Sequence, residues 1–346
     1  MNKFFRNIFI LITSFILLSA ISIISVLWTY SNDLPDYKFL KSYKPPVSSK
    51  VYSGNGDLVA DFSQEKRVFV PFNSIPKNVI NAFLSAEDKN FFKHPGVDAK
   101  GVIRAVINNI SNILSSKRLE GASTITQQVA KNFLLTNEVS LNRKIKEAIL
   151  AFRIERALSK ERILELYLNQ IYLGSGAYGV AAASLEYFDK SIKDLNYSEA
   201  ALLAALPKAP SRYNPYRDPD IAKFRRNLVL KNLLDNNYLT SEWYEKLTKE
   251  EIILKKNKKI YLEDAQYFIE DVRKSVIETL SYDKVYKQGF NINTPIDLNL
   301  QTIATKSLRD GLIAYDKRKG WRGPLTNKIY NSEWKKDLEK YKLENS

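Results

Sequence analysis

Residues 87–96 read EDKNFFKHPG, which places two adjacent carboxylates beside two phenylalanines, the only histidine of the chain and a Pro-Gly turn signal. One interpretation is a helix end at which Glu87 and Asp88 are solvated and the phenylalanines face the core. The other is a catalytic carboxylate in a partly dry site. His94 predicts a hydrogen-bonded turn and no metal site, because no second histidine or cysteine exists to complete a common type of site.

The composition narrows the classes of partner. The chain has 346 residues, 45% of them hydrophobic, and 53 Lys and Arg against 38 Asp and Glu, a net charge of +15. Such a charge favours nucleic acid, anionic lipid head groups or phosphorylated substrates. The lack of cysteine excludes disulfides and thiolate metal sites, and it is compatible with an exported location.

The N-terminal region predicts a membrane anchor. Residues 7–32 contain no charged side chain, and roughly 20 apolar residues are enough to span a bilayer. A cleaved signal peptide would have a shorter apolar region and a small-x-small cleavage site, which is not evident. Lys3 and Arg6 precede the segment, so the positive-inside rule predicts a single-pass protein of the inner (cytoplasmic) membrane with a cytoplasmic N-terminus. The catalytic domain would then be periplasmic, and we expect no nucleic-acid partner.

The rest of the chain divides by pattern. A β-hairpin is predicted over 49–62, because alternating runs flank Asn55-Gly56. Helical patterns follow from about residue 75, and in 99–114 an apolar stripe predicts a helix that faces a core or a membrane interface. The predicted units are a cytoplasmic tail and transmembrane anchor (1–32), a stalk and hairpin (33–74), a helical domain (75–245), and a linker with an incomplete further region (246–346).

A second polar stretch is GASTITQQVAKN (121–132). Its seven polar side chains lie at a predicted helix N-terminus, which suits binding of a phosphate or a sugar. A polar helix with a Ser or Thr cap explains the stretch equally well. The residues concerned are Ser123, Thr124, Thr126, Gln127, Gln128, Lys131 and Asn132.

A third stretch, RKIKEAILAFRIE (143–155), combines cations with an acid. Arg143 and Glu147 are spaced i,i+4, so the simplest interpretation is a surface ion pair worth ~0.3–0.5 kcal/mol. The alternative is an acid surrounded by cations, among them Lys144 and Lys146, that bind a polyanion.

Together these stretches resemble the family 51 peptidoglycan glycosyltransferases, the domain found in class A penicillin-binding proteins and monofunctional transglycosylases. EDKNFFKHPG resembles the first family motif at every fixed position, GASTITQQVAKN the second and RKIKE the third. KERILELYLNQIYLGSGAYGVAAAS (160–184) resembles the fourth and RRNLVLKNL (225–233) the fifth. Asp189 and Ala205 stand where the family usually has glycine, which questions local turn geometry and not the reaction.

The resemblance implies a fold and a reaction. The fold is mainly α, a lysozyme-like glycosyltransferase domain with a small membrane-facing lobe, preceded by the transmembrane helix and followed by a small mixed α/β segment. The substrates are lipid II and the growing glycan chain. The reaction makes a β-1,4 linkage with inversion and releases undecaprenyl pyrophosphate. Membrane phospholipids and other cell-wall synthesis proteins are further expected partners.

The resemblance also implies residue roles. Glu87 matches the catalytic base and Glu147 the second essential glutamate, while Lys131, Arg143 and Lys144 match cations that stabilise the pyrophosphate. No cofactor is required by the sequence, although Mg²⁺ or Mn²⁺ assists some members through ligands that the motifs do not name. The matching substrate-binding positions are Ser123, Thr124, Gln128, Lys131, Asn132, Arg143 and Lys144. The matching supporting positions are Asp88, Phe91, His94, Tyr167 and Asn169.

Two other functions stay open at this point: a lysozyme-like glycan hydrolase, and an inactive scaffold. A hydrolase has less need of a Lys/Arg cluster or an anchor, and the intact glutamates argue against a scaffold. Residues 290–324 resemble the segment that joins the two catalytic domains of class A enzymes. The Ser-x-x-Lys spacing at 281–284 precedes that segment and is interpreted as coincidence, so we expect a synthase truncated before its transpeptidase domain and no transpeptidase activity.

Overall fold

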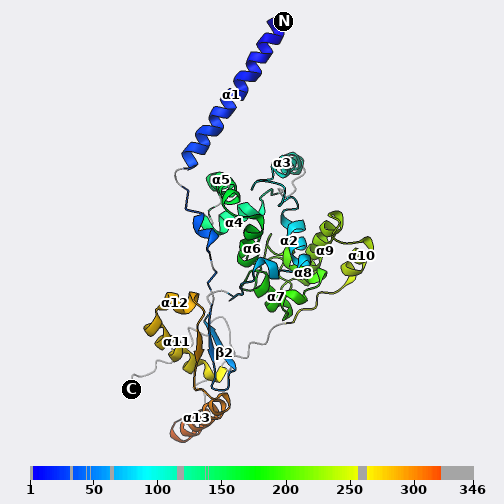
Figure 1. Cartoon of the computed structure of the whole chain (residues 1–346). Helices are drawn as coiled ribbons and strands as arrows, with labels where there is room; N and C mark the ends of the chain where they lie inside the picture. Colours follow the sequence, from blue (N-terminus) through cyan, green and yellow to red (C-terminus); the bar gives the residue numbers. More distant parts are fainter. Residues whose placement is uncertain are drawn as a thin grey trace, which may run out of the picture.

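The chain folds mainly into helices, as predicted (Figure 1). The computed structural model describes residues 3–31, 34–43, 45–46, 48–62, 66–114, 121–136, 138, 140–255 and 263–320. The helices are α1 (Lys3–Ser31), α2 (Lys77–Glu87), α3 (Ala99–Leu114), α4 (Ile125–Leu134), α5 (Leu141–Ala157), α6 (Lys160–Gln170), α7 (Val180–Phe188), α8 (Tyr197–Ala205), α9 (Pro219–Asp235), α10 (Ser241–Lys249), α11 (Gln266–Leu280), α12 (Tyr282–Lys287) and α13 (Leu298–Lys319). The strands are β1 (Ser49–Tyr52), β2 (Leu58–Phe62), β3 (Lys66–Arg67), β4 (Ala177–Tyr178) and β5 (Asn291–Asn293).

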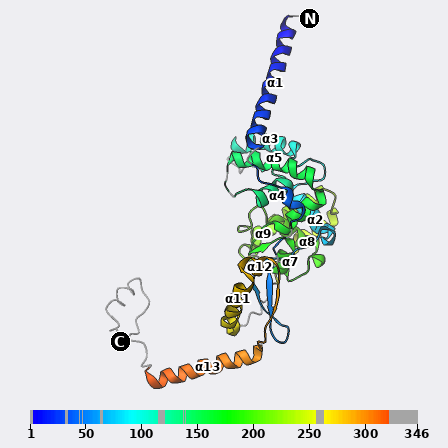
Figure 2. The same cartoon turned by 60° about the vertical axis from the view of Figure 1, so that its left-hand side comes forward.

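Helix α1 extends away from the other helices in both views (Figures 1 and 2). Its C-terminal end contacts α5, where the Tyr30 hydroxyl donates to Asn142 Oδ1 over 2.7 Å and Arg153 donates to the Ser31 hydroxyl. Described apolar side chains such as Phe15 are exposed. Within the described part of the chain, no helix has both the length and the apolar character needed to cross a membrane. The transmembrane anchor therefore stays a prediction.

The core of the helical region surrounds α8. From Ala200 to Ala205 this helix is buried on all sides, which fits the lack of polar side chains in that part of its sequence. Its alanines, among them Ala200, Ala201 and Ala204, are small enough for α2 and α9 to pack closely against it. Ala205, one of the two departures from the family pattern, is also buried here.

Asp189, the other departure, ends α7. Its φ of 52° is in the left-handed region, which glycine usually occupies at a helix C-terminus. Asp is among the few other residues that tolerate this conformation, because its short polar side chain can bond locally. Helix α7 therefore ends in a left-handed residue without a glycine.

The predicted hairpin is confirmed, and it has a third strand. Strands β1 and β2 pair antiparallel around the Asn55-Gly56 turn, and β5 joins β1 in parallel, with Lys50 opposite Asn291. Helices α11 and α12 pack on this sheet. The hairpin and the segment 269–298 therefore share a second hydrophobic cluster. Its buried members are Val51, Val59, Ala60, Phe62 and Val285.

Helix α3 turns its apolar stripe outward. Buried Ala105 faces the domain, whereas the larger apolar side chains are exposed, so the core interpretation of this stripe is wrong. The helix lies at the same end of the domain as α5 and the base of α1 (Figures 1 and 2). The exposed residues are Val102, Ile103, Val106, Ile107 and Ile110. Most of the predicted basic loop that follows, residues 115–120, lies outside the described residues.

Candidate active site

The loop that follows α2 is held by its own side chains. Asp88, the C-cap of α2, is buried, and both of its carboxylate oxygens lie 3.0 Å from His94 Nε2. Asp88 Oδ2 also accepts from the backbone N–H of Ile125, the first residue of α4. The Gly96 N–H donates to His94 Nδ1 over 3.2 Å, so a neutral His94 carries its proton on Nε2. Asp88 and His94 therefore fix the loop. His94 does not line the cavity beside Glu87, whereas Asp88 does.

Gly96 closes this loop against α5. Its φ of +106° is one that side chains rarely adopt, and a Cβ there would lie 2.8 Å from the carbonyl carbon and oxygen of Ala151. The Gly96 carbonyl accepts from the Thr124 hydroxyl. The lack of a side chain at Gly96 lets the first motif pack closely against α5. The Thr124 hydrogen bond joins the first motif to the second.

Helix α4 brings the second motif to the catalytic candidate. Thr124 and Gln127 form a capping box, which satisfies free N–H groups at the start of the helix. One turn later, Gln128 Nε2 donates to Glu87 Oε2 over 2.7 Å. The cap therefore sets the position of the amide that holds the Glu87 carboxylate.

Burial raises the pKa of Glu87 above its ordinary value. Part of the side chain reaches a cavity, but the surrounding protein removes most of the water from the carboxyl group and disfavours its charged form. The Gln128 hydrogen bond and the charges of Lys208 and Arg225 oppose this effect without cancelling it. A carboxyl group with a raised pKa is a stronger base once it is ionised.

Tyr167 lies deeper in the same region. It is fully buried, its ring packs edge-on against Phe83, and its hydroxyl has no hydrogen-bond partner among the described residues. Burial, together with the negative charges of Glu87 and Asp88, raises its pKa well above the usual tyrosine value. Tyr167 therefore stays neutral. Its ring adds apolar surroundings near Glu87, and its hydroxyl oxygen is the one polar atom of the side chain.

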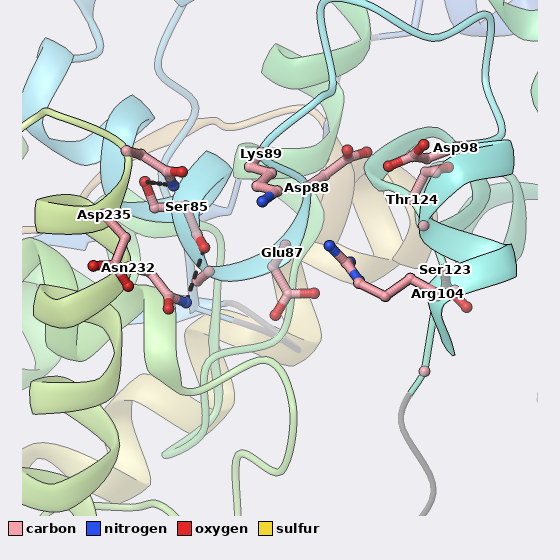
Figure 3. Close-up of a pocket in the computed structure, with 15 residues that line it drawn as sticks. Ser85, Glu87, Asp88, Lys89, Asp98, Arg104, Ser123, Thr124, Asn232 and Asp235 are labelled. Carbon is pink, nitrogen blue, oxygen red and sulfur yellow. Dashed lines mark hydrogen bonds between the residues drawn. The ribbon is translucent and has the colours of Figure 1, made fainter. Parts of the chain in front are cut away.

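A cavity of about 310 Å³ opens beside Glu87 (Figure 3). Ser123 and Thr124 line one side, and Asn232 and Asp235 of α9 line the other. In Figure 3 the side chain of Arg104 extends from α3 towards Glu87. The full lining is Ser85, Ala86, Glu87, Asp88, Lys89, Asp98, Gly101, Arg104, Gly121, Ala122, Ser123, Thr124, Asn232, Asp235 and Asn236.

Glu147 is buried, which makes the surface ion-pair interpretation wrong. Its side chain is 1% exposed and accepts from Arg143 and from Lys144 Nζ, the latter over 2.6 Å. Lys144 Nζ also donates to Ser123 Oγ over 2.8 Å, and Ser123 lines the cavity. The third motif is thus connected to the cavity through Lys144.

Other predicted residues lie away from the cavity. Lys131 and Asn132 occupy the last turn of α4 and are partly exposed and exposed, respectively. Phe91 belongs to the loop 88–96, and its side chain is fully buried. Asn169 is also buried and bonds both the N–H and the carbonyl of Val70, so it fixes a neighbouring segment.

Most cavity residues were not predicted as site residues from the sequence, among them Arg104, Asn232, Asp235 and Asn236. Arg104 had a detectable signal, because it is the only charged residue between Gly101 and Leu114. A lone cation inside an apolar stripe interrupts the pattern, although Arg104 is exposed and so carries no cost of burial. Asn232 lies within the stretch 225–233 that resembles the fifth family motif. Asp235 and Asn236 had no such signal, since polar residues near a helix end are common.

No cluster of three or more potential metal ligands occurs within the described residues. The carboxylates beside the cavity instead have partners: Asp98 accepts from Asn90 Nδ2, and Glu87 accepts from Gln128. Assistance by Mg²⁺ or Mn²⁺ stays a prediction.

Comparisons with known proteins agree on one family. A sequence model described as transglycosylase matches residues 55–234. Penicillin-binding protein 1A of Rickettsia felis is 49% identical over 316 residues, 91% of this chain and 40% of that protein. The Aquifex aeolicus protein of the same name is 49% identical over 283 residues, 82% of this chain and 38% of that protein.

A solved structure is similar as well. The crystal structure of penicillin-binding protein 1A from Haemophilus influenzae matches with a TM-score of 0.51 and 28% sequence identity. The match covers 88% of this chain and 36% of that one. This chain therefore spans about 40% of the length of the relatives named above.

Proposed function

Because this chain belongs to the transglycosylase family, we propose that it is a peptidoglycan glycosyltransferase that polymerises lipid II into β-1,4 glycan strands. The observation that carries the proposal is the Glu87 carboxylate, which is held by Gln128 at the edge of the cavity and has a raised pKa. The growing glycan on its lipid pyrophosphate is the donor, and the 4-hydroxyl of lipid II is the acceptor.

Glu87 acts as the general base in this proposal. A sugar hydroxyl is a weak nucleophile, and a positioned base accelerates its attack by ~10²–10⁴-fold. Glu87 accepts the hydroxyl proton as the oxygen attacks the anomeric carbon from the face opposite the pyrophosphate, which inverts that carbon. The bond to the undecaprenyl pyrophosphate breaks in the same step. The raised pKa supports this role, because it brings the base nearer to working pH.

Cations stabilise the leaving group. Negative charge develops on the pyrophosphate, and preorganised positive charge at that position lowers the barrier. Arg143 and Lys144 are held rigidly because both donate to buried Glu147, and Lys131 lies near the end of α4. Glu147 therefore acts by orienting these cations. Ser123, which accepts from Lys144, supports a path from this cluster to the cavity.

Helices α1 and α3 would hold the enzyme at the membrane that carries its lipid substrates. The uncharged stretch 7–32 supports an anchor, and the exposed apolar stripe of α3 supports contact with phospholipids. Both lie at the same end of the domain (Figures 1 and 2). The location we propose is the inner membrane with the catalytic domain outside the cytoplasm, where other cell-wall synthesis proteins are available as partners.

The test is incubation of the purified protein with lipid II, followed by separation of the products by size. We expect glycan polymer from the wild type. Shortening of preformed glycan without polymer would instead identify a hydrolase. An absence of both activities would favour a non-enzymatic scaffold.

A further inference from the structure

A second cluster of charges contacts the loop 88–96, and its residues do not line the cavity. Lys160, the first residue of α6, donates through Nζ to the His94 carbonyl over 2.7 Å and to Glu155 Oε1 over 2.7 Å. The same ammonium lies 4.4 Å from the centre of the Phe91 ring, within cation–π range. One side chain thus holds the loop at its aromatic residue and at its histidine.

Glu155 connects this lysine to two more elements. Its Oε1 also accepts from the Thr126 hydroxyl of α4 over 2.6 Å. Its Cγ would lie 3.1 Å from a Cβ on Gly96, so the glutamate borders the turn at the end of the loop. The side chains of Glu155 and Lys160 are 8% and 19% exposed, which makes the pair mostly buried.

We propose that Lys160 and Glu155 are positioning residues that clamp the loop 88–96 and thereby set the orientation of the Glu87 carboxylate. The inference rests on the proposed function for its effect on rate. Neither residue lines the cavity, so neither touches a substrate bound there.

The contacts form a continuous path to the base. Lys160 holds the His94 carbonyl, the His94 ring holds Asp88, and Asp88 is the covalent neighbour of Glu87. The start of α4 is held at two points: the Ile125 N–H donates to Asp88, and the Thr126 hydroxyl donates to Glu155. The same helix carries Gln128, whose amide binds Glu87. Without the clamp, the loop and the start of α4 can both move. The Glu87 carboxylate and the Gln128 amide that binds it are then no longer held in a fixed orientation.

The kinetic test uses Lys160→Met, Glu155→Gln and the double variant, each assayed with lipid II. A displacement of about 1 Å at a catalytic group costs on the order of 10²-fold in rate, so we expect kcat to fall about 10- to 100-fold with KM little changed. The single effects should not add, because each breaks the same clamp. The double variant also removes both buried charges, so it guards against unfolding caused by one unpaired charge.

The matched control is Lys190→Met. Lys190 forms an ion pair of similar length with Glu199, 2.6 Å, elsewhere in the helical domain, and neither residue contacts the loop in the described interactions. This variant should keep the wild-type kcat. Variants of the clamp that lower only the melting temperature, with kcat per folded molecule unchanged, would overturn the proposal.

A second readout does not need activity. His94 is the only histidine, so ¹⁵N-histidine labelling gives one pair of ring nitrogen signals. At about pH 8.5, above the usual histidine range, the wild type should show a fixed Nε2–H tautomer with widely separated shifts. Lys160→Met should bring the two shifts together, as the tautomers exchange. An unchanged tautomer would overturn the clamp.

The two readouts separate the two proposals. Polymer from the wild type with an unchanged kcat in all clamp variants overturns the clamp and leaves the glycosyltransferase function standing. A wild type that makes no polymer, but whose His94 tautomer depends on Lys160, overturns the function and leaves the clamp standing.

Discussion

Gln128 Nε2 donates a hydrogen bond to Glu87 Oε2 over 2.7 Å and so joins two motifs that are 41 residues apart in the chain. The bond fixes the direction in which the carboxylate faces. Because the amide comes from the second turn of a well-capped helix, the base is oriented by a rigid element and not by a loop.

Replacement of Glu87 by Gln should lower the polymerisation kcat by at least ~10²-fold, because the amide cannot accept the acceptor proton. KM should change little, since the side chain keeps its size. Fluorescent lipid II and separation of the products by length measure both quantities. Activity within tenfold of the wild type would exclude Glu87 as the base, provided that circular dichroism shows an intact fold.

The raised pKa of Glu87 predicts a pH dependence of stability. Between the ordinary value of 4.5 and the raised value, the folded protein binds more protons than the unfolded chain, so the free energy of unfolding falls as pH rises through this window. Urea unfolding of the wild type and Glu87→Gln should show the wild type losing stability relative to the variant from pH 4.5 upward, and levelling off above the raised pKa. The opposite slope would mean that Lys208, Arg225 and the Gln128 amide outweigh burial and the Asp88 charge.

The two cations on Glu147 should differ in their contribution to stability. Arg143 is 11% exposed and Lys144 is 45% exposed, so only Arg143→Met leaves the buried carboxylate with a mainly solvated partner. We expect a loss of about 3 kcal/mol for Arg143→Met and about 0–1 kcal/mol for Lys144→Met. Urea unfolding at neutral pH measures both. Equal losses would contradict the difference in burial between Arg143 and Lys144.

Substitution of Gly96 should test the closure of the loop on α5. Gly96 and Gly176 both have positive φ, +106° and +74°, but only Gly96 would bring a Cβ to 2.8 Å from Ala151, whereas Gly176 has open space. Gly176→Ala should cost about 1 kcal/mol for the backbone conformation alone, and Gly96→Ala at least about 1 kcal/mol more, because backbone must move. Thermal unfolding compares them. Similar losses would argue against close packing of the loop.

Local signals in the sequence predicted most elements correctly. Ser159 stands directly before the stretch 160–184 that resembles the fourth motif, and it caps α6 by accepting from the Arg162 N–H. The Asn55-Gly56 hairpin formed as predicted, because its turn requires a positive φ that Gly56 supplies. These features depend on residues a few positions apart.

Burial was not predictable in the same way. The Arg143 and Glu147 spacing fits an exposed pair as well as a buried one, and only the packing of α4 on α5 excludes water from the glutamate. The position of Asn232 at the cavity was not predictable from neighbouring residues either. Its side chain donates to the Ser85 carbonyl, 147 positions away in the chain.

By itself, the sequence determined the helices, the hairpin and the family, because caps, turns and motif spacing are written in neighbouring residues. The tertiary structure decided which charged groups are buried and which apolar stripe faces outward. It also decided that β5 pairs with β1, where Lys50 lies opposite Asn291. The physical reason is that desolvation and long-range pairing are sums over all the atoms that surround a group. Those atoms come from segments that only the fold brings together.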